Sequence, residues 1–155
     1  MNHFTEIRTL TLILLLLLGS IPVSAVERPF ALKGAGVATL ITDESGMPIG
    51  AIPTGSGTAT HLGQWTVAGN VKYTLDSGGV LRSSGQATIT AANGDKLQVE
   101  LEGILDPAAG VDQGVFRFVG GTGRFENASG SANFVVTINP LSGGFELTVV
   151  GMIDY

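Results

Sequence analysis

Apolar side chains occur at every second position through much of this chain. In residues 96–105, Leu97, Val99 and Leu101 alternate with polar residues, and the same spacing recurs in 144–154. Successive side chains of a β-strand point to opposite faces, so a period of two indicates strands with one apolar face. Beyond residue 25, no stretch carries the 3.6-residue period of an amphipathic helix convincingly. The pattern therefore predicts an all-β fold.

Turn residues divide the chain into about eight segments of strand length. The pairs Asn93-Gly94 and Gly143-Gly144 are typical of tight reversals between antiparallel strands. Between the segments there is no helical spacer of the kind that parallel pairing requires. We expect strands near 30–42, 56–62, 65–73, 85–92, 96–105, 115–119, 129–139 and 144–154, with the longest loop at 43–54.

An antiparallel sheet with one apolar face has to cover that face. Closing on itself covers the face and also removes the exposed strand edges. About eight strands enclose a lumen just wide enough for packed side chains or for one small ligand. We therefore expect one domain at 26–155, an eight-stranded antiparallel up-and-down β-barrel. A two-sheet sandwich is the structural alternative.

Residues 1–25 have the character of a secretory signal peptide. Arg8 precedes an apolar run from Leu10 to Leu18, and Val23-Ser24-Ala25 fits the small-residue cleavage pattern. The run is shorter than the roughly 20 residues of a membrane-spanning helix. We expect cleavage after Ala25, a secreted or periplasmic location, and no membrane association afterwards. An uncleaved N-terminal anchor is the alternative.

The composition excludes several classes of site. The chain has no Cys, which rules out disulfides, thiolate metal ligands and a cysteine nucleophile. Its net charge of −5 makes nucleic acid an unexpected partner. Because His61 is the single His beyond residue 25, we expect no metal and no cofactor. Asp43-Glu44, or Asp106 with Asp112, could bind calcium between loops, but solvated turn acids explain them better.

A glycine-rich turn carries a family resemblance. Residues 120–125, Gly-Gly-Thr-Gly-Arg-Phe, followed by Ala-Ser-Gly at 128–130, resemble a signature of the allene oxide cyclase and dirigent barrel superfamily. Residues 60–63, Thr-His-Leu-Gly, are similar to a motif of small exported bacterial proteins of this kind. The resemblance implies a closed β-barrel with a mainly apolar lumen. It carries no catalysis over: the plant cyclase site includes a cysteine, and Glu100 and Glu102 lie on the polar face, unlike the lumen acids of dirigent proteins.

Seven side chains are candidates for contact with a ligand in the lumen. Six are aromatic residues at the strand positions that share the apolar face. If Thr58 and Thr60 face water, alternation turns the His61 imidazole toward the lumen as well. The alternatives are a filled aromatic core and a structural histidine at the barrel rim. Phe125, in the glycine-rich turn, is expected to plug one end. The candidates are His61, Trp65, Tyr73, Phe116, Phe118, Phe134 and Phe145.

We interpret the chain as an exported soluble barrel without assigned catalysis, with a small apolar molecule in its lumen as the expected partner. One alternative is a cyclase or isomerase that folds a flexible apolar substrate there, with His61 as the candidate catalytic residue. Such an enzyme needs a cavity of at least about 300 Å³. The other alternative is a small outer-membrane barrel, which would require aromatic girdles and an outward apolar face.

Overall fold

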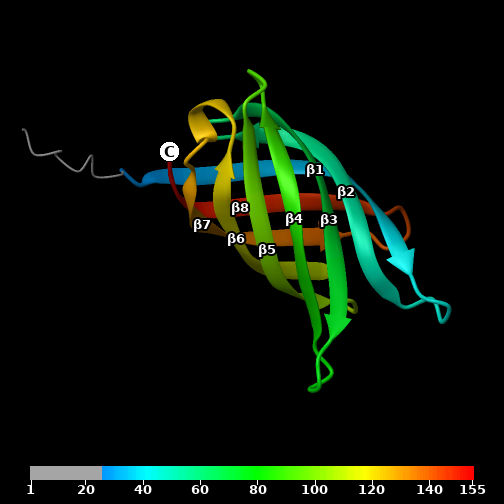
Figure 1. The fold of residues 1–155 in the computed structure, drawn as a ribbon. Coiled ribbons are helices and arrows are strands. Elements are labelled where there is room, and N and C mark those ends of the chain that lie inside the picture. Colours follow the sequence, from blue (N-terminus) through cyan, green and yellow to red (C-terminus); the bar gives the residue numbers. More distant parts are fainter. Residues whose placement is uncertain (1–25) are drawn as a thin grey trace, which may run out of the picture.

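Eight strands in chain order form a closed antiparallel barrel (Figure 1). The computed structural model describes residues 26–155, so the expected signal peptide at 1–25 lies outside the described residues. The barrel prediction is confirmed, and the sandwich alternative is excluded because the eighth strand pairs with the first. The strands are β1 (Arg28–Thr42), β2 (Pro48–Ala59), β3 (Gly63–Leu75), β4 (Leu81–Ala91), β5 (Lys96–Asp106), β6 (Val111–Gly121), β7 (Ser129–Ile138) and β8 (Gly144–Asp154).

Alternation along each strand sorts side chains between the lumen and the outer face. On β5, Leu97, Val99 and Leu101 are buried, and the polar side chains between them are exposed. On β7, Phe134 is 2% exposed and its neighbour Val135 is 44% exposed. Removing the apolar set from water drives the sheet to close, because this is the largest favourable term in folding.

Part of the inner surface formed by β1 and β2 consists of glycines and therefore carries no side chains. Gly34 and Gly36 of β1 pair with glycines of β2. In a sequence such residues suggest a bulge, but the pairing of β1 with β2 continues through them without a register shift. A Cβ on Gly36 would lie 2.8 Å from the ring of Phe145, and one on Gly34 would overlap the ring of Trp65. The glycines therefore make room for two aromatic rings from neighbouring strands.

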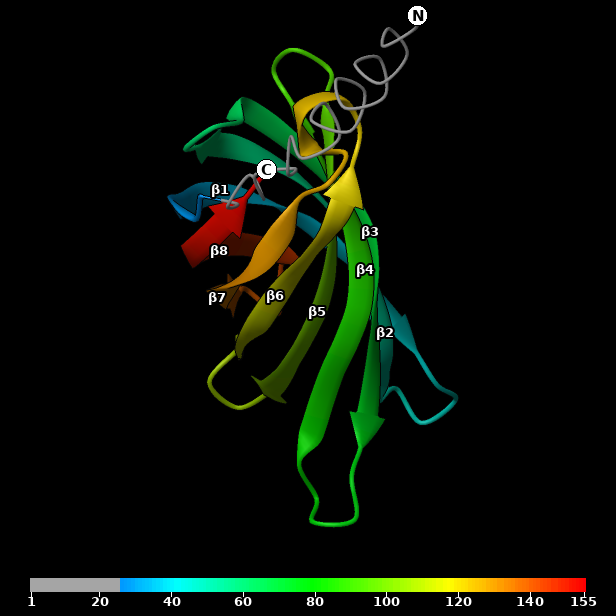
Figure 2. The same cartoon turned by 60° about the vertical axis from the view of Figure 1, so that its left-hand side comes forward.

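One end of the barrel is sealed by the segment between β6 and β7 (Figures 1 and 2). It forms the 3₁₀ helix η1 (Gly123–Phe125), and the ring of Phe125 is fully buried beneath it, as predicted. The Asp95 carboxylate in the β4–β5 turn accepts a hydrogen bond from the Arg124 backbone N–H at 3.4 Å and pairs with its guanidinium at 3.5 Å. We call this the closed end. Within 26–155 no helix is long and apolar enough to cross a membrane.

The opposite end, which we call the mouth, carries the loops 43–47, 76–80, 107–110 and 139–143. The β1–β2 and β3–β4 hairpins extend furthest there (Figure 2). The expected long loop at 43–54 is wrong, since β2 already begins at Pro48. Pro53 of β2 has no N–H to donate. The pairing of β2 with β3 is accordingly interrupted between Ala51 and Thr54 and then resumes. The hairpin at Asn93-Gly94 forms as predicted.

We predict that Phe134→Ala lowers the free energy of unfolding by about 3–5 kcal/mol. The ring is buried and packs against Phe116, with ring centroids 4.8 Å apart. Chemical denaturation measures the change. Val135→Ala, on the outer face of the same strand, is the control and should cost less than about 1 kcal/mol. An unchanged midpoint for Phe134→Ala would mean that the inner and outer faces are assigned the wrong way round.

Candidate functional site

A small apolar cavity lies in the lumen on the mouth side. Its volume is about 80 Å³, it is partly open to solvent, and every strand contributes at least one side chain to its wall. The space exists because small side chains stand at several inner positions, among them Ala38, Ala51 and Ala87. The wall is aliphatic and aromatic except for two ionisable groups, Tyr73 and Asp112.

Asp112 of β6 is the polar centre of this wall. It is 5% exposed, and the buried hydroxyl of Ser83 on β4 donates a hydrogen bond to its Oδ1 at 2.7 Å. The two strands are not neighbours, because β5 runs between them. Gly103 of β5 pairs with Ser83, and a Cβ at Gly103 would stand 2.7 Å from the Ser83 Oγ. The missing side chain at Gly103 is what allows the two polar groups to meet.

The surroundings favour the protonated forms of both ionisable groups. Burial raises the pKa of the Asp112 carboxyl, and the hydrogen bond from Ser83 opposes this in part. Burial, and then the nearby Asp112 carboxylate, raise the pKa of Tyr73 to about 12. A neutral phenol can donate a hydrogen bond. The Tyr73 hydroxyl is therefore a donor in the cavity wall, which also holds the buried Asp112 carboxyl.

The structure brings four of the seven candidates from the sequence to this cavity. Two others are buried in the core but stand outside the cavity wall: Trp65, whose Nε1 has no hydrogen-bond partner, and Phe118, which packs against Phe30 with ring centroids 4.9 Å apart. The four that line the cavity are Tyr73, Phe116, Phe134 and Phe145.

His61 does not line the cavity, in contrast to the expectation from parity. β2 ends at Ala59, and His61 has a left-handed backbone conformation with φ 67°, so strand alternation no longer applies to it. Its Nε2–H donates to the Pro29 carbonyl oxygen at 2.9 Å, and its ring packs on Tyr155 with centroids 5.5 Å apart. These contacts place His61 at the closed end and agree with a structural histidine at the rim.

The sequence interpretation missed Asp112. It was expected to be a solvated turn acid, which is wrong because β6 begins at Val111 and turns the next side chain inward. Asp112 shares parity with Phe116 and Phe118, and that was the available signal. Asp43 is exposed, as expected, and accepts a hydrogen bond from the Ser45 hydroxyl at 2.6 Å. No group of three or more acidic or His side chains in 26–155 could hold a metal ion.

Comparison with solved structures shows which known fold this barrel is similar to. No protein-family model matches the sequence, and no curated protein matches it. Twelve solved chains match the structure, among them a pterocarpan synthase dirigent protein. That match has a TM-score of 0.53 and 15% sequence identity, and it covers 83% of this chain and 88% of the other. The barrel is dirigent-like. This match confirms the fold that the resemblance of residues 120–125 implied.

We predict that Asp112→Asn stabilises the protein relative to wild type more at about pH 7 than at about pH 3. The folded state holds the Asp112 proton more tightly than the unfolded chain, in which an aspartate carboxyl has its ordinary pKa of 3.8. Stability of the wild type therefore falls as pH rises from 3.8 to the folded pKa and stays lower above it. Asn does not titrate and can still accept the Ser83 hydrogen bond.

Thermal denaturation at the two pH values measures this difference. Glu100→Gln, which changes an exposed acid on β5, is the matched control and should show little dependence on pH. Equal stabilisation of Asp112→Asn at both pH values would show that burial does not perturb this carboxyl.

Proposed function

We propose that this chain is an exported dirigent-like barrel that binds one small apolar molecule at the mouth side of its lumen, with no catalysis assigned. The observation that carries the proposal is the lumen cavity, whose apolar wall surrounds the buried Asp112 carboxyl. Apolar walls with a small number of oriented polar groups are typical of small-molecule sites. The signal-like sequence at 1–25 supports export.

The size of the cavity restricts how a ligand can bind. Its 80 Å³ is well below the roughly 150 Å³ of a protein cavity that accepts benzene. Leu40 and Leu75 stand on the inner faces of β1 and β3 at the mouth and are 42% and 56% exposed. They continue the apolar surface outward. We therefore propose that the ligand inserts one end, bearing a hydrogen-bonding group for Tyr73 or Asp112, and rests its remainder on these leucines.

The same observations favour this proposal over the two alternatives. A volume of 80 Å³ favours binding over a cyclase or isomerase, because enclosing a flexible substrate calls for about 300 Å³ or more. Apolar side chains that face inward, and polar ones that face outward on β5, favour this proposal over an outer-membrane barrel, whose apolar band must face lipid.

Filling the cavity tests the proposal. Val136 of β7 lines the cavity, and Val136→Phe places a larger side chain in it, whereas Val135→Phe makes the same change on the outer face of the same strand. Small molecules that co-purify from the native host are identified by mass spectrometry. We expect one apolar compound in the wild type and in Val135→Phe, and its loss in Val136→Phe.

His61→Ala serves as a second control, because His61 does not line the cavity, and it should retain the compound. Equal occupancy in Val136→Phe and Val135→Phe, or no compound in the wild type, would overturn the proposal of a lumen ligand.

A further inference from the structure

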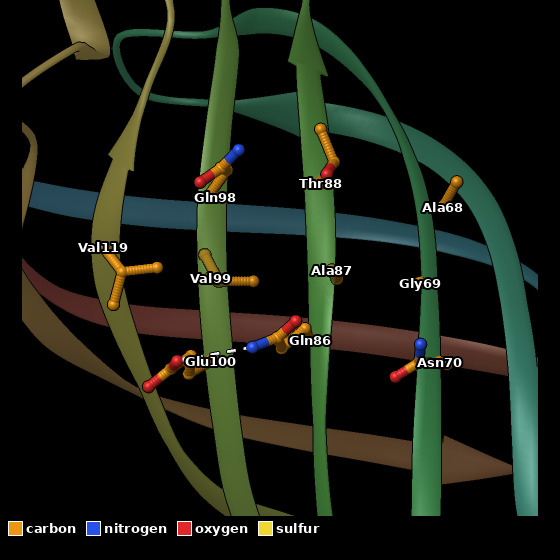
Figure 3. Close-up of a pocket in the computed structure, with 10 residues that line it drawn as sticks. All are labelled: Ala68, Gly69, Asn70, Gln86, Ala87, Thr88, Gln98, Val99, Glu100 and Val119. Carbon is orange, nitrogen blue, oxygen red and sulfur yellow. Dashed lines mark hydrogen bonds between the residues drawn. The ribbon is translucent and has the colours of Figure 1, made fainter.

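A larger hollow lies on the outer face of the barrel, across β3, β4, β5 and β6 (Figure 3). Its volume is about 540 Å³, compared with about 80 Å³ for the lumen cavity. Among its lining residues, Ala68 is a small side chain on the outer face of β3. Its volume falls in the range of about 300–1,000 Å³ that is usual for ligand sites.

The polar side chains of this hollow stand in register on neighbouring strands. Asn70, Gln86 and Glu100 occupy one cross-strand row, and Thr88 and Gln98 occupy the next. Neighbouring strands are about 4.8 Å apart, and alternate residues along a strand are about 6.8 Å apart. The side chains therefore form a regular lattice of hydrogen-bonding groups over one face of the sheet.

Each amide in the lattice both donates and accepts hydrogen bonds. The amide of Gln86 donates to Glu100 Oε1 at 3.4 Å, a long contact that leaves most of the hydrogen-bonding capacity of the hollow directed at solvent (Figure 3). A ligand that matches this surface must carry closely spaced groups that themselves donate and accept.

The charge of the hollow disfavours anionic ligands. None of its ten lining residues is Lys, Arg or His. Arg117, which stands across from Glu100 on β6, is already paired with Glu102 at 3.0 Å. Glu100 would repel such a ligand. An extended peptide cannot add as a strand, because both edges of each of these four strands are already paired within the barrel.

Neutral hydroxyl groups fit the remaining requirements. A hydroxyl donates to Glu100 and both donates to and accepts from the amides. Ala68 and Val119, which is 46% exposed, offer apolar contact to C–H groups. We propose that the outer hollow binds a neutral oligosaccharide through Asn70, Gln86, Gln98 and Glu100.

Nuclear magnetic resonance titration tests this on ¹⁵N-labelled protein purified after expression from the full-length sequence. The probes are cellotetraose, maltotetraose and mannotetraose, with trigalacturonate as the anionic probe. We expect at least one neutral sugar to shift the side-chain amide signals of Asn70, Gln86 and Gln98 in a saturable way, and trigalacturonate to leave them unchanged.

Two variants and a matched control locate the site. Gln86→Ala combined with Gln98→Ala removes two amides and should weaken binding at least about tenfold, equivalent to 1.4 kcal/mol. Ala68→Trp fills the hollow without removing a hydrogen-bonding group and should also block binding. Asn133→Ala deletes an exposed amide from the outer face of β7, outside the hollow, and should bind as wild type does.

The proposal is overturned if no neutral sugar gives saturable shifts at these amides. It is also overturned if trigalacturonate alone binds, or if Asn133→Ala weakens binding as much as the double variant. The lumen variant Val136→Phe should bind the sugar normally, because Val136 lies on the inner face of β7. Failure of one site is therefore distinguishable from failure of the other.

Discussion

The volume that a closed eight-stranded sheet encloses constrains every inner position of this protein. Interiors pack without large voids, so each large side chain in the lumen needs a small one opposite. Trp65 and Phe145 occupy the space that Gly34 and Gly36 leave empty. Where alanines line the lumen on the mouth side, a cavity of about 80 Å³ remains. Core and candidate site are thus two outcomes of one volume constraint.

The two ends of the barrel differ: the closed end is packed, and the mouth is partly exposed to solvent. At the closed end, the glycine-rich turn buries Phe125 and is held by the Asp95–Arg124 contacts. At the mouth, leucines on inner faces remain partly exposed. The lumen is therefore closed at one end and partly open at the other, and Asp112 lies in the wall of the partly open half.

The sequence predicted what depends on local alternation and failed where strand boundaries decide. The period of two predicted the barrel and buried positions such as Phe134. Within a strand, odd and even positions stay on opposite faces even when the predicted strand ends are wrong. Parity is valid only inside a strand, so it misplaced His61, which follows the end of β2, and it was not applied to Asp112, at the start of β6. Those boundaries depend on pairing with distant segments. The outer hollow depends on cross-strand register, which no single segment encodes.

Gly103 carries no functional group, yet the Ser83 hydroxyl that donates to Asp112 lies in the space a side chain at Gly103 would occupy. A survey that truncates side chains one at a time would pass over this residue, because there is nothing to truncate. Only enlargement reveals its part: even one methyl group would come against the Ser83 hydroxyl and the Phe134 ring. A position with no side chain can therefore tolerate change as poorly as a position in the aromatic core.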